Sequence, residues 1–365
     1  MTFHAMTFGE VMGRIAPPGF QRFVQCLPGP IEMTFAGAEA NVAVSLSLLG
    51  ARASFVTALP GNPLGDACIK ALRGLGVDTS HIVRTSAGRL GLYFIETGAN
   101  QRGGNVIYDR DGSSVMLAEP TLYDWPSLLS GVDWFHVTGI TPSLSERATA
   151  ATLQAVRAAR TAGVTVSCDL NFRKKLWRWR PGVRPRDLAE ETMRQVLQSV
   201  DLLIANEEDA ADVLGIHAAS TDVESGRLNV AGYREVAREI VKQFANIRRV
   251  AFTLRESISA SHNNWGGMLY DAATDTAHYA PTDGSDNYRP YEIRNIVDRV
   301  GGGDAFAAGL IFALNTEGLS APDRAIRFAV AASCLKHSVP GDFNYVTRAE
   351  VEALMEGPGT GRVQR

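Results

Sequence analysis

The stretch DRVGGGDAFAAG, residues 298–309, places three consecutive glycines directly before a run of helix-forming residues. Glycines let bare backbone N–H groups converge, and the start of a helix adds the positive end of its dipole. Gly301, Gly302 and Gly303 are therefore expected to form an anion-binding site, for which a phosphate group is the natural ligand. Asp304 follows at once, where a carboxylate can take a proton from a hydroxyl that attacks a phosphoryl group.

Two interpretations of this stretch stay open on its own. In the catalytic one, Asp304 is a base beside the phosphate, and a side chain at Gly302 would enter the space that the phosphate needs. In the other, the glycines form an ordinary loop and Asp304 only caps the helix that follows.

Short apolar segments alternate with amphipathic segments along most of the chain. Such alternation predicts an α/β fold, a doubly wound and mostly parallel sheet with helices on both faces. We expect strands at residues 7–16, 53–58, 132–138, 165–169, 202–205 and 249–254. We expect helices at residues 38–49, 66–75, 145–162, 187–200, 207–214, 233–244, 305–314 and 322–336.

Two segments, residues 17–35 and 90–117, interrupt this alternation. In the second, Leu92 and Phe94 and then Val106 and Tyr108 alternate with other residues as in antiparallel strands. We interpret both segments as a small β lid over one edge of the sheet. The α/β core would comprise residues 1–16, 36–89 and 118–357, and residues 358–365 a flexible tail.

Composition excludes several classes of partner. The chain of 365 residues has 36 Lys and Arg against 39 Asp and Glu, a formal net charge of −3, without a long basic block. We therefore expect neither nucleic acid nor a membrane as partner. The four cysteines show no CxxC spacing, which is typical of reduced thiols in a cytoplasmic protein. Whether the chain forms a homo-oligomer stays open.

The glycine stretch resembles the C-terminal signature of the ribokinase/PfkB carbohydrate kinases, in which GGGD is followed by Ala-Phe and Asp298 stands three residues before the glycines. The family's N-terminal signature is matched by AGAEANVA, residues 36–43, through Gly37 and Asn41. Ala36 stands where the family usually has the first of two glycines. The resemblance implies a ribokinase-like fold, an anion hole at the glycines and Asp304 as the base.

The same resemblance implies ATP and Mg²⁺ as cofactors. Asn206 and Asp209, in the run NEED at residues 206–209, match the family's Asn-x-x-Glu element, with Asp in place of Glu. By resemblance Asn206 handles phosphate and Asp209 the metal ion. Asn171, Thr253 and Arg255 complete the expected nucleotide contacts. From the residues alone, this run is a helix N-terminus whose acids complement the dipole.

Within the family, residues 93–96, 106–110 and 169–173 resemble 2-keto-3-deoxygluconate kinases. That similarity places Tyr93, Tyr108, Arg110 and Arg173 at the substrate, with Asp342 as a further contact. A sugar acid needs a cation for its carboxylate, and arginine offers a matching planar fork. The implied reaction transfers phosphate from ATP to the 6-hydroxyl. Alternatively, these side chains are solvated surface, and Arg173 pairs with an acid such as Asp169.

Three other functions remain to be separated. A neutral hexose such as fructose would fit the arginines less well. A nicotinamide-dependent oxidoreductase is disfavoured because no GxGxxG opens the helix after the first strand. A non-catalytic sugar-binding regulator would need no base at Asp304. His136 and His337 are interpreted as structural residues.

Overall fold

The computed structural model describes residues 2–217, 230–283 and 287–357. Within these ranges the largest element is a nine-stranded sheet in the order β14-β13-β12-β11-β10-β9-β1-β4, with β15 beside β13. From β12 to β4 neighbouring strands are parallel, whereas β13, β14 and β15 pair antiparallel. The strands are β1 His4–Phe8, β4 Arg52–Val56, β9 Trp134–Thr138, β10 Thr165–Asp169, β11 Leu202–Ala205, β12 Arg249–Ser259, β13 His262–Asp271, β14 Thr276–Ala280 and β15 Tyr291–Ile293.

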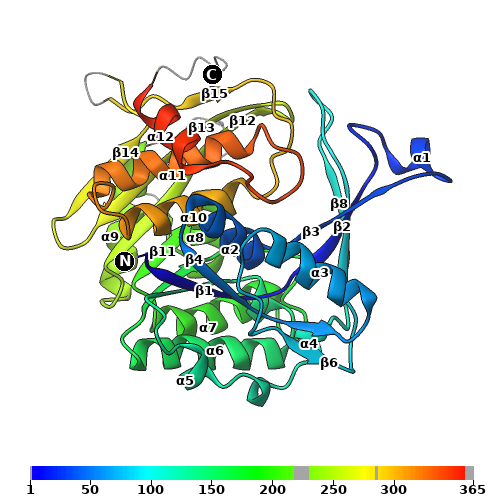
Figure 1. Cartoon of the computed structure of the whole chain (residues 1–365). Coiled ribbons are helices and arrows are strands. Elements are labelled where there is room, and N and C mark those ends of the chain that lie inside the picture. Colours follow the sequence, from blue (N-terminus) through cyan, green and yellow to red (C-terminus); the bar gives the residue numbers. More distant parts are fainter. Residues whose placement is uncertain (1, 218–229, 284–286, 358–365) are drawn as a thin grey trace.

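Helices cover both faces of this sheet (Figure 1). Successive strand residues point to opposite faces, so Met6 and Phe135 pack in one apolar core while Ala5 and Trp134 pack in the other. The first core is covered by α5 Trp125–Leu128, α6 Glu146–Thr161, α7 Pro185–Leu197, α8 Glu207–Leu214 and α9 Val230–Gln243. The second is covered by α2 Ala38–Leu49, α10 Gly302–Leu314, α11 Pro322–Lys336 and α12 Arg348–Glu356. The predicted doubly wound, mostly parallel α/β arrangement is thus confirmed.

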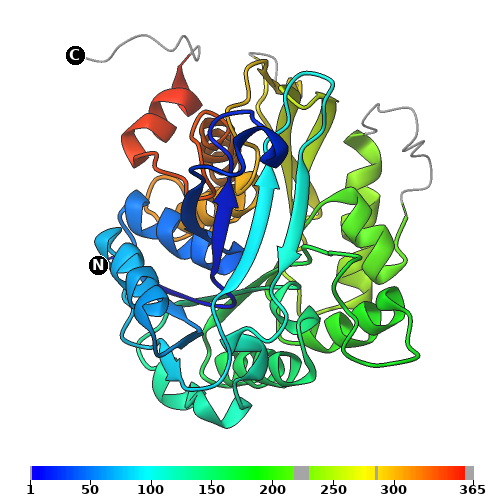
Figure 2. The ribbon, with the colours of Figure 1, turned by 90° about the vertical axis from the view of Figure 1, so that its right-hand side faces the viewer.

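A second sheet stands beside the carboxyl ends of the core strands. It has four described strands in the order β3-β2-β7-β8, which Figure 2 shows side by side in dark blue and cyan. The predicted antiparallel pair at residues 90–117 is confirmed, because β7 pairs antiparallel with β8. We call this sheet the lid; its strands are β2 Met12–Ala16, β3 Glu32–Ala36, β7 Gly91–Glu96 and β8 Asn105–Asp109.

Shorter elements lie within and between the two parts of the chain. They are α1 Phe23–Cys26 at the lid tip, α3 Pro63–Gly74, α4 Ser114–Leu117, the paired strands β5 Ala58–Pro60 and β6 Val83–Thr85, and two short 3₁₀ turns, Pro120–Leu122 and Thr141–Ser143.

The single strand expected at residues 7–16 is wrong. The chain forms β1 in the core and β2 in the lid, so residues 12–16, which we had placed with the core, pair with β3 and β7 instead. The break lies at Gly9, where a Cβ would stand 2.1 Å from the carboxyl carbon of Glu39. Only a glycine lets Glu39 approach the backbone this closely, and this contact is invisible in a local pattern.

The strand expected at residues 249–254 is longer than predicted. β12 continues to Ser259 and turns into β13, with which it pairs antiparallel, so residues 255–262 belong to a hairpin. The tail predicted at residues 358–365 lies outside the described residues. All four cysteines are free thiols. In the described part of the chain, no helix has the length and apolar character to cross a membrane.

Candidate active site

A cavity of about 690 Å³ lies between the lid and the carboxyl ends of the core strands, where ligands of doubly wound sheets bind. The structure brings every sequence-predicted site residue into its wall. These residues are Gly37, Asn41, Tyr93, Tyr108, Arg110, Asn171, Arg173, Asn206, Asp209, Thr253, Arg255, Gly301, Gly302, Gly303, Asp304 and Asp342.

The glycine run forms the amino end of α10. Gly301 precedes the helix with φ +82°, and a Cβ there would stand 2.2 Å from the carbonyl oxygen of Asp342, so this position requires glycine. Among the described residues, none accepts a hydrogen bond from the backbone N–H groups of Gly303 and Asp304. These donors and the helix dipole make the predicted anion site available.

The expectation for Gly302 needs a correction. A Cβ at Gly302 would stand 3.2 Å from the ring of His337 rather than in open space, and the residue is not in the left-handed region. A Cβ at Gly303 would meet nothing within 4 Å. A side chain added at Gly303 would therefore enter open space, unlike one at Gly302.

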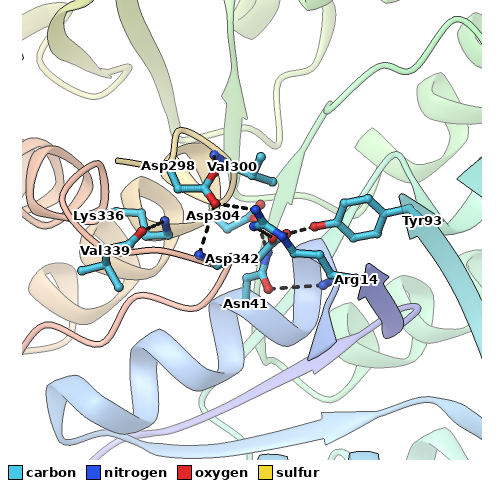
Figure 3. A network of polar contacts seen from close by, with 11 residues as sticks. Arg14, Asn41, Tyr93, Asp298, Val300, Asp304, Lys336, Val339 and Asp342 are labelled. Atoms are coloured by element: carbon cyan, nitrogen blue, oxygen red, sulfur yellow. Dashed lines mark hydrogen bonds and ion pairs between the residues drawn. The ribbon is translucent and has the colours of Figure 1, made fainter. Parts of the chain in front are cut away.

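Asp304 does not cap α10. The capping position is Gly301, without a side-chain cap, and Asp304 stands in the first helical turn. Its Oδ2 accepts a hydrogen bond of 2.6 Å from Nδ2 of Asn41, near the start of α2 (Figure 3). Burial raises the pKa of Asp304 to about 6, although Asn41, Arg173 and Lys336 favour its ionised form. At neutral pH it is an ionised carboxylate of useful basicity.

A buried ionic network that the motifs did not indicate joins the lid to the core. Arg14 of β2 donates from Nη1 to Oδ1 of Asp342 at 2.6 Å and from Nη2 to Oδ2 of Asp298 at 2.5 Å. Tyr93 of β7 donates to the same Oδ1 of Asp342 at 2.6 Å (Figure 3). The predicted substrate contacts Tyr93 and Asp342 thus bind each other. A charged residue inside the apolar run VMGRIA was the available sequence signal.

Arg110 is less free than its predicted role suggests. Its Nε donates at 2.8 Å to Oε2 of Glu10, and its Nη2 donates to the same oxygen. Both side chains are buried, and the guanidinium carbon lies 5.5 Å from the ring centre of Tyr108. One edge of the predicted fork is therefore occupied within the protein.

Arg173, in contrast, lies exposed at the cavity. It donates to the carbonyl of Phe172 at 3.1 Å, and no described carboxylate lies within ion-pair distance, so the alternative pairing with Asp169 does not form. Asn171 adopts the left-handed region at φ +38°, with its N–H bound to Oδ1 of Asp169 at 3.1 Å. Burial, followed by Asp209 and Asp304, raises the pKa of Asp169.

Asn206 and Asp209 stand at the N-terminus of α8 and also face the cavity, so the helix-capping interpretation and the ligand-binding interpretation are compatible. Oδ1 of Asn206 caps α8 by accepting from the N–H of Asp209 at 2.8 Å, yet both residues also line the cavity. Burial raises the pKa of Asp209 to about 7, and its Oδ1 accepts from the N–H of Phe172 at 3.2 Å. Within the described ranges, no group of three His, Cys, Asp or Glu side chains is arranged to hold a metal ion.

Arg299 and His337 also line the cavity and were not predicted as site residues. Nη2 of Arg299 donates to the carbonyls of Ser259 at 2.9 Å and Ala260 at 3.0 Å, which fixes the β12–β13 hairpin against the glycine run. Burial lowers the pKa of His337 to about 4, and that of His136 in the core to about 3, so both rings are neutral. The structural interpretation of His136 agrees with its place in the core.

Comparison with known proteins gives this cavity a family. A model described as "pfkB family carbohydrate kinase" matches residues 4–255. The chain is also 31% identical over 361 residues, 99% of each chain, to a Haloferax volcanii protein named 2-dehydro-3-deoxygalactonokinase. The chain belongs to the pfkB family of carbohydrate kinases.

Solved and curated relatives extend the similarity over the whole of this pfkB kinase. A crystal structure of 2-dehydro-3-deoxygluconokinase from Thermotoga maritima is 41% identical, with a TM-score of 0.86, and covers 97% of this chain and 100% of that chain. A 2-dehydro-3-deoxygluconokinase from Thermoproteus tenax is 29% identical over 86% of this chain and 85% of its own length. The resemblance predicted from the sequence is confirmed.

Proposed function

We propose that this pfkB kinase transfers a phosphoryl group from ATP to the terminal hydroxyl of a 2-keto-3-deoxy sugar acid, with 2-keto-3-deoxygluconate as the first candidate. This is the compound that the relatives' names call 2-dehydro-3-deoxygluconate. The observation that carries the proposal is the position of Asp304 at two backbone N–H groups, those of Gly303 and Asp304 itself, that have no acceptor among the described residues, in a cavity lined by arginines.

The residues of the cavity wall fit a nucleoside triphosphate. The cavity volume lies in the range of small-molecule sites, and its glycine run offers N–H donors at a helix start. A magnesium ion bound with ATP would neutralise charge on the phosphates; such ions are held mainly by phosphate, water and one or two carboxylates. Asp209, in the wall beside Asn206, is the candidate carboxylate. Asn171, Thr253 and Arg255 remain the candidate nucleotide contacts.

The geometry supports a direct transfer. A sugar hydroxyl beside Asp304 gives its proton to the carboxylate while its oxygen bonds to the γ-phosphorus and the bond to the departing ADP oxygen breaks. The N–H groups of Gly303 and Asp304 stabilise the charge on the transferring group. Asn41 fixes Asp304 by its 2.6 Å hydrogen bond, so the base is oriented before substrate arrives.

The arginines in and beside the cavity wall favour an acid over a neutral hexose as the substrate. Arg14 is already paired with two carboxylates and Arg110 with one, whereas Arg173 has no described carboxylate within ion-pair distance. A substrate carboxylate would supply the missing partner of Arg173. A regulator without catalysis would not need a carboxylate at the anion site. A cytoplasmic location and a homo-oligomer stay predictions.

An ADP-release assay over matched substrates tests the proposal. The panel contains 2-keto-3-deoxygluconate, its galactonate epimer, fructose and ribose, each with ATP and Mg²⁺. We expect kcat/KM to be highest for one of the two keto-deoxy acids. A preference for fructose would contradict the substrate class while leaving the kinase assignment, and absence of ADP release with every sugar would contradict catalysis.

A further inference from the structure

Glu10 is a buried carboxylate that the reaction above does not use. It lies between β1, which ends at Phe8 in the core sheet, and β2, which begins at Met12 in the lid. Its exposed fraction is 3%. A carboxylate this far from water carries a cost unless a partner offsets it.

The chain crosses between core and lid at three further places, and Glu10 contacts each of them. Its carbonyl oxygen lies 2.1 Å from where a Cβ would stand on Gly37, which joins β3 to α2. Its Oε1 lies 2.7 Å from where a Cβ would stand on Gly91, the first residue of β7. Its Oε2 accepts both hydrogen bonds from Arg110, directly after β8. All four crossings therefore meet at one residue.

The contact with Arg110 also defines how that side chain meets the cavity. Nε and Nη2 both bind Oε2 of Glu10, whereas Nη1 has no hydrogen-bond acceptor among the described residues. Arg110 lines the cavity beside Tyr108. Glu10 thus holds one edge of the guanidinium and leaves the other nitrogen for a ligand.

We propose that Glu10 is a positioning residue, which orients Arg110 toward the sugar carboxylate from the point where the four lid crossings meet. Recognition of the acid end of the substrate then depends on this carboxylate at the base of the lid. This inference rests on the proposed function, because it takes Arg110 as a ligand of the sugar acid.

Glu10→Gln tests the inference with little change in shape. The substitution replaces a buried ion pair by a hydrogen bond from the charged Arg110 to a neutral amide oxygen, so Arg110 is held less firmly in the variant. We expect the KM for the sugar acid to rise roughly tenfold and the KM for ATP to change less than about twofold. In Glu10→Gln/Arg110→Met, the KM should be no higher than in Arg110→Met alone, because the first change acts through the second residue.

Two further variants keep the test decisive. Gly91→Ala leaves the charge of Glu10 in place but puts a methyl group 2.7 Å from Oε1, so it should raise the sugar-acid KM in the same direction. Asp109→Asn is the control. Asp109 directly precedes Arg110, but its ion pair with Arg89 is exposed, so the loss of this pair should leave the sugar-acid KM unchanged. Circular dichroism and the melting temperature show whether each variant folds.

The outcomes separate this inference from the proposed function. If Arg110→Met alone leaves the sugar-acid KM unchanged, Arg110 is no substrate ligand and this inference fails, whereas the proposed function fails only if the ADP-release assay shows no preference for a keto-deoxy acid. If Arg110→Met raises this KM but Glu10→Gln does not, only the inference fails. A lower KM in Glu10→Gln would mean that Glu10 competes with the substrate for Arg110, which overturns the inference. A general structural role would raise the KM of the double variant above that of Arg110→Met, or reduce kcat/KM for fructose as much as for the sugar acid. Either result also overturns the inference.

Discussion

Asp304 owes its properties to its immediate neighbours. Asn41 holds Oδ2, while Oδ1 has no hydrogen-bond partner among the described residues. Burial works against ionisation and raises the pKa, and the cations Arg173 and Lys336 oppose that shift. The result is a carboxylate that is ionised at neutral pH yet more basic than one in water. Such a group can accept a proton as the sugar oxygen attacks.

Replacing Asp304 by Asn keeps the size and the position beside Asn41 but removes proton acceptance. We expect kcat to fall by roughly 10²-fold or more, with the KM for the sugar changed much less. Steady-state kinetics with the preferred substrate measure both constants. Near wild-type turnover would show that Asp304 is not the base.

The pH profile provides a second check on Asp304. Its pKa of about 6 means that the active, ionised form predominates above pH 6 and is lost below it. The value of kcat/KM should therefore be nearly flat from pH 7 to 8 and fall about tenfold per unit below pH 6. A descending limb near pH 4 would show that the pKa of the base is not raised.

Arg173 offers a test of specificity at the residue scale. Arg173→Ala removes a cation that has no described carboxylate partner, and hydrogen bonds to charged groups contribute about 1.5–3 kcal/mol. The ratio of kcat/KM for the sugar acid over that for fructose should drop about tenfold or more. Equal losses on both sugars would indicate a structural arginine.

At the scale of elements, the lid is fastened to the core by ions as well as by chain connections. Arg14 projects from β2 toward Asp298 before α10 and Asp342 after α11. All three side chains are about 5% exposed. The ion pairs therefore lie out of water, where removing one partner leaves a buried charge without compensation.

Replacing Arg14 by Met should weaken the whole fold. Breaking a buried ion pair costs about 3–5 kcal/mol, so the free energy of unfolding in urea should fall by that amount. Arg89→Ala, two residues before β7, is the control, because its ion pair with Asp109 of β8 is exposed and such pairs contribute about 1 kcal/mol or less. A loss in Arg14→Met no larger than the control would contradict the role of this network.

For the molecule as a whole, local patterns predicted the alternation of strands and helices, and the family resemblance predicted a set of residues that all line the cavity. Motifs such as the glycine run are contiguous, so their residues reach the site together. Arg14 and Glu10 could not be assigned in this way, because their partners are 328, 284 and 100 residues away. The break at Gly9 escaped prediction for the same reason, since it depends on the position of Glu39.

Glu39 is a buried carboxyl group whose protonation makes the stability of the fold depend on pH. It lies wholly buried in α2, its Oε1 accepts from the hydroxyls of Thr138 and Thr141, and its Oε2 has no partner among the described residues. Burial raises its pKa from 4.5 to about 7. A raised pKa means that the folded state favours the protonated form, so this contribution to stability is complete below pH 4.5 and is lost as pH rises through 7.

Glu39→Gln should therefore flatten the dependence of stability on pH. Between pH 5 and 8, the free energy of unfolding of the wild type should fall by about 2–3 kcal/mol more than that of the variant, at 1.36 kcal/mol per pKa unit. Urea titrations at the two pH values measure this difference, in which any uniform effect of the substitution cancels. Identical pH dependence in both proteins would show that Glu39 does not titrate in this range.

The ion pair between Arg14 and Asp342 can form only late in the synthesis of the chain. The two residues are 328 positions apart, and a ribosome adding about 5–20 residues per second needs roughly 20–60 s to go from one to the other. During that interval Arg14 has neither Asp298 nor Asp342 to bind for most of the time, and the glycine run that completes the cavity does not yet exist. The nascent chain can thus pair β2 within the lid early, but it becomes able to bind nucleotide only when translation is nearly finished.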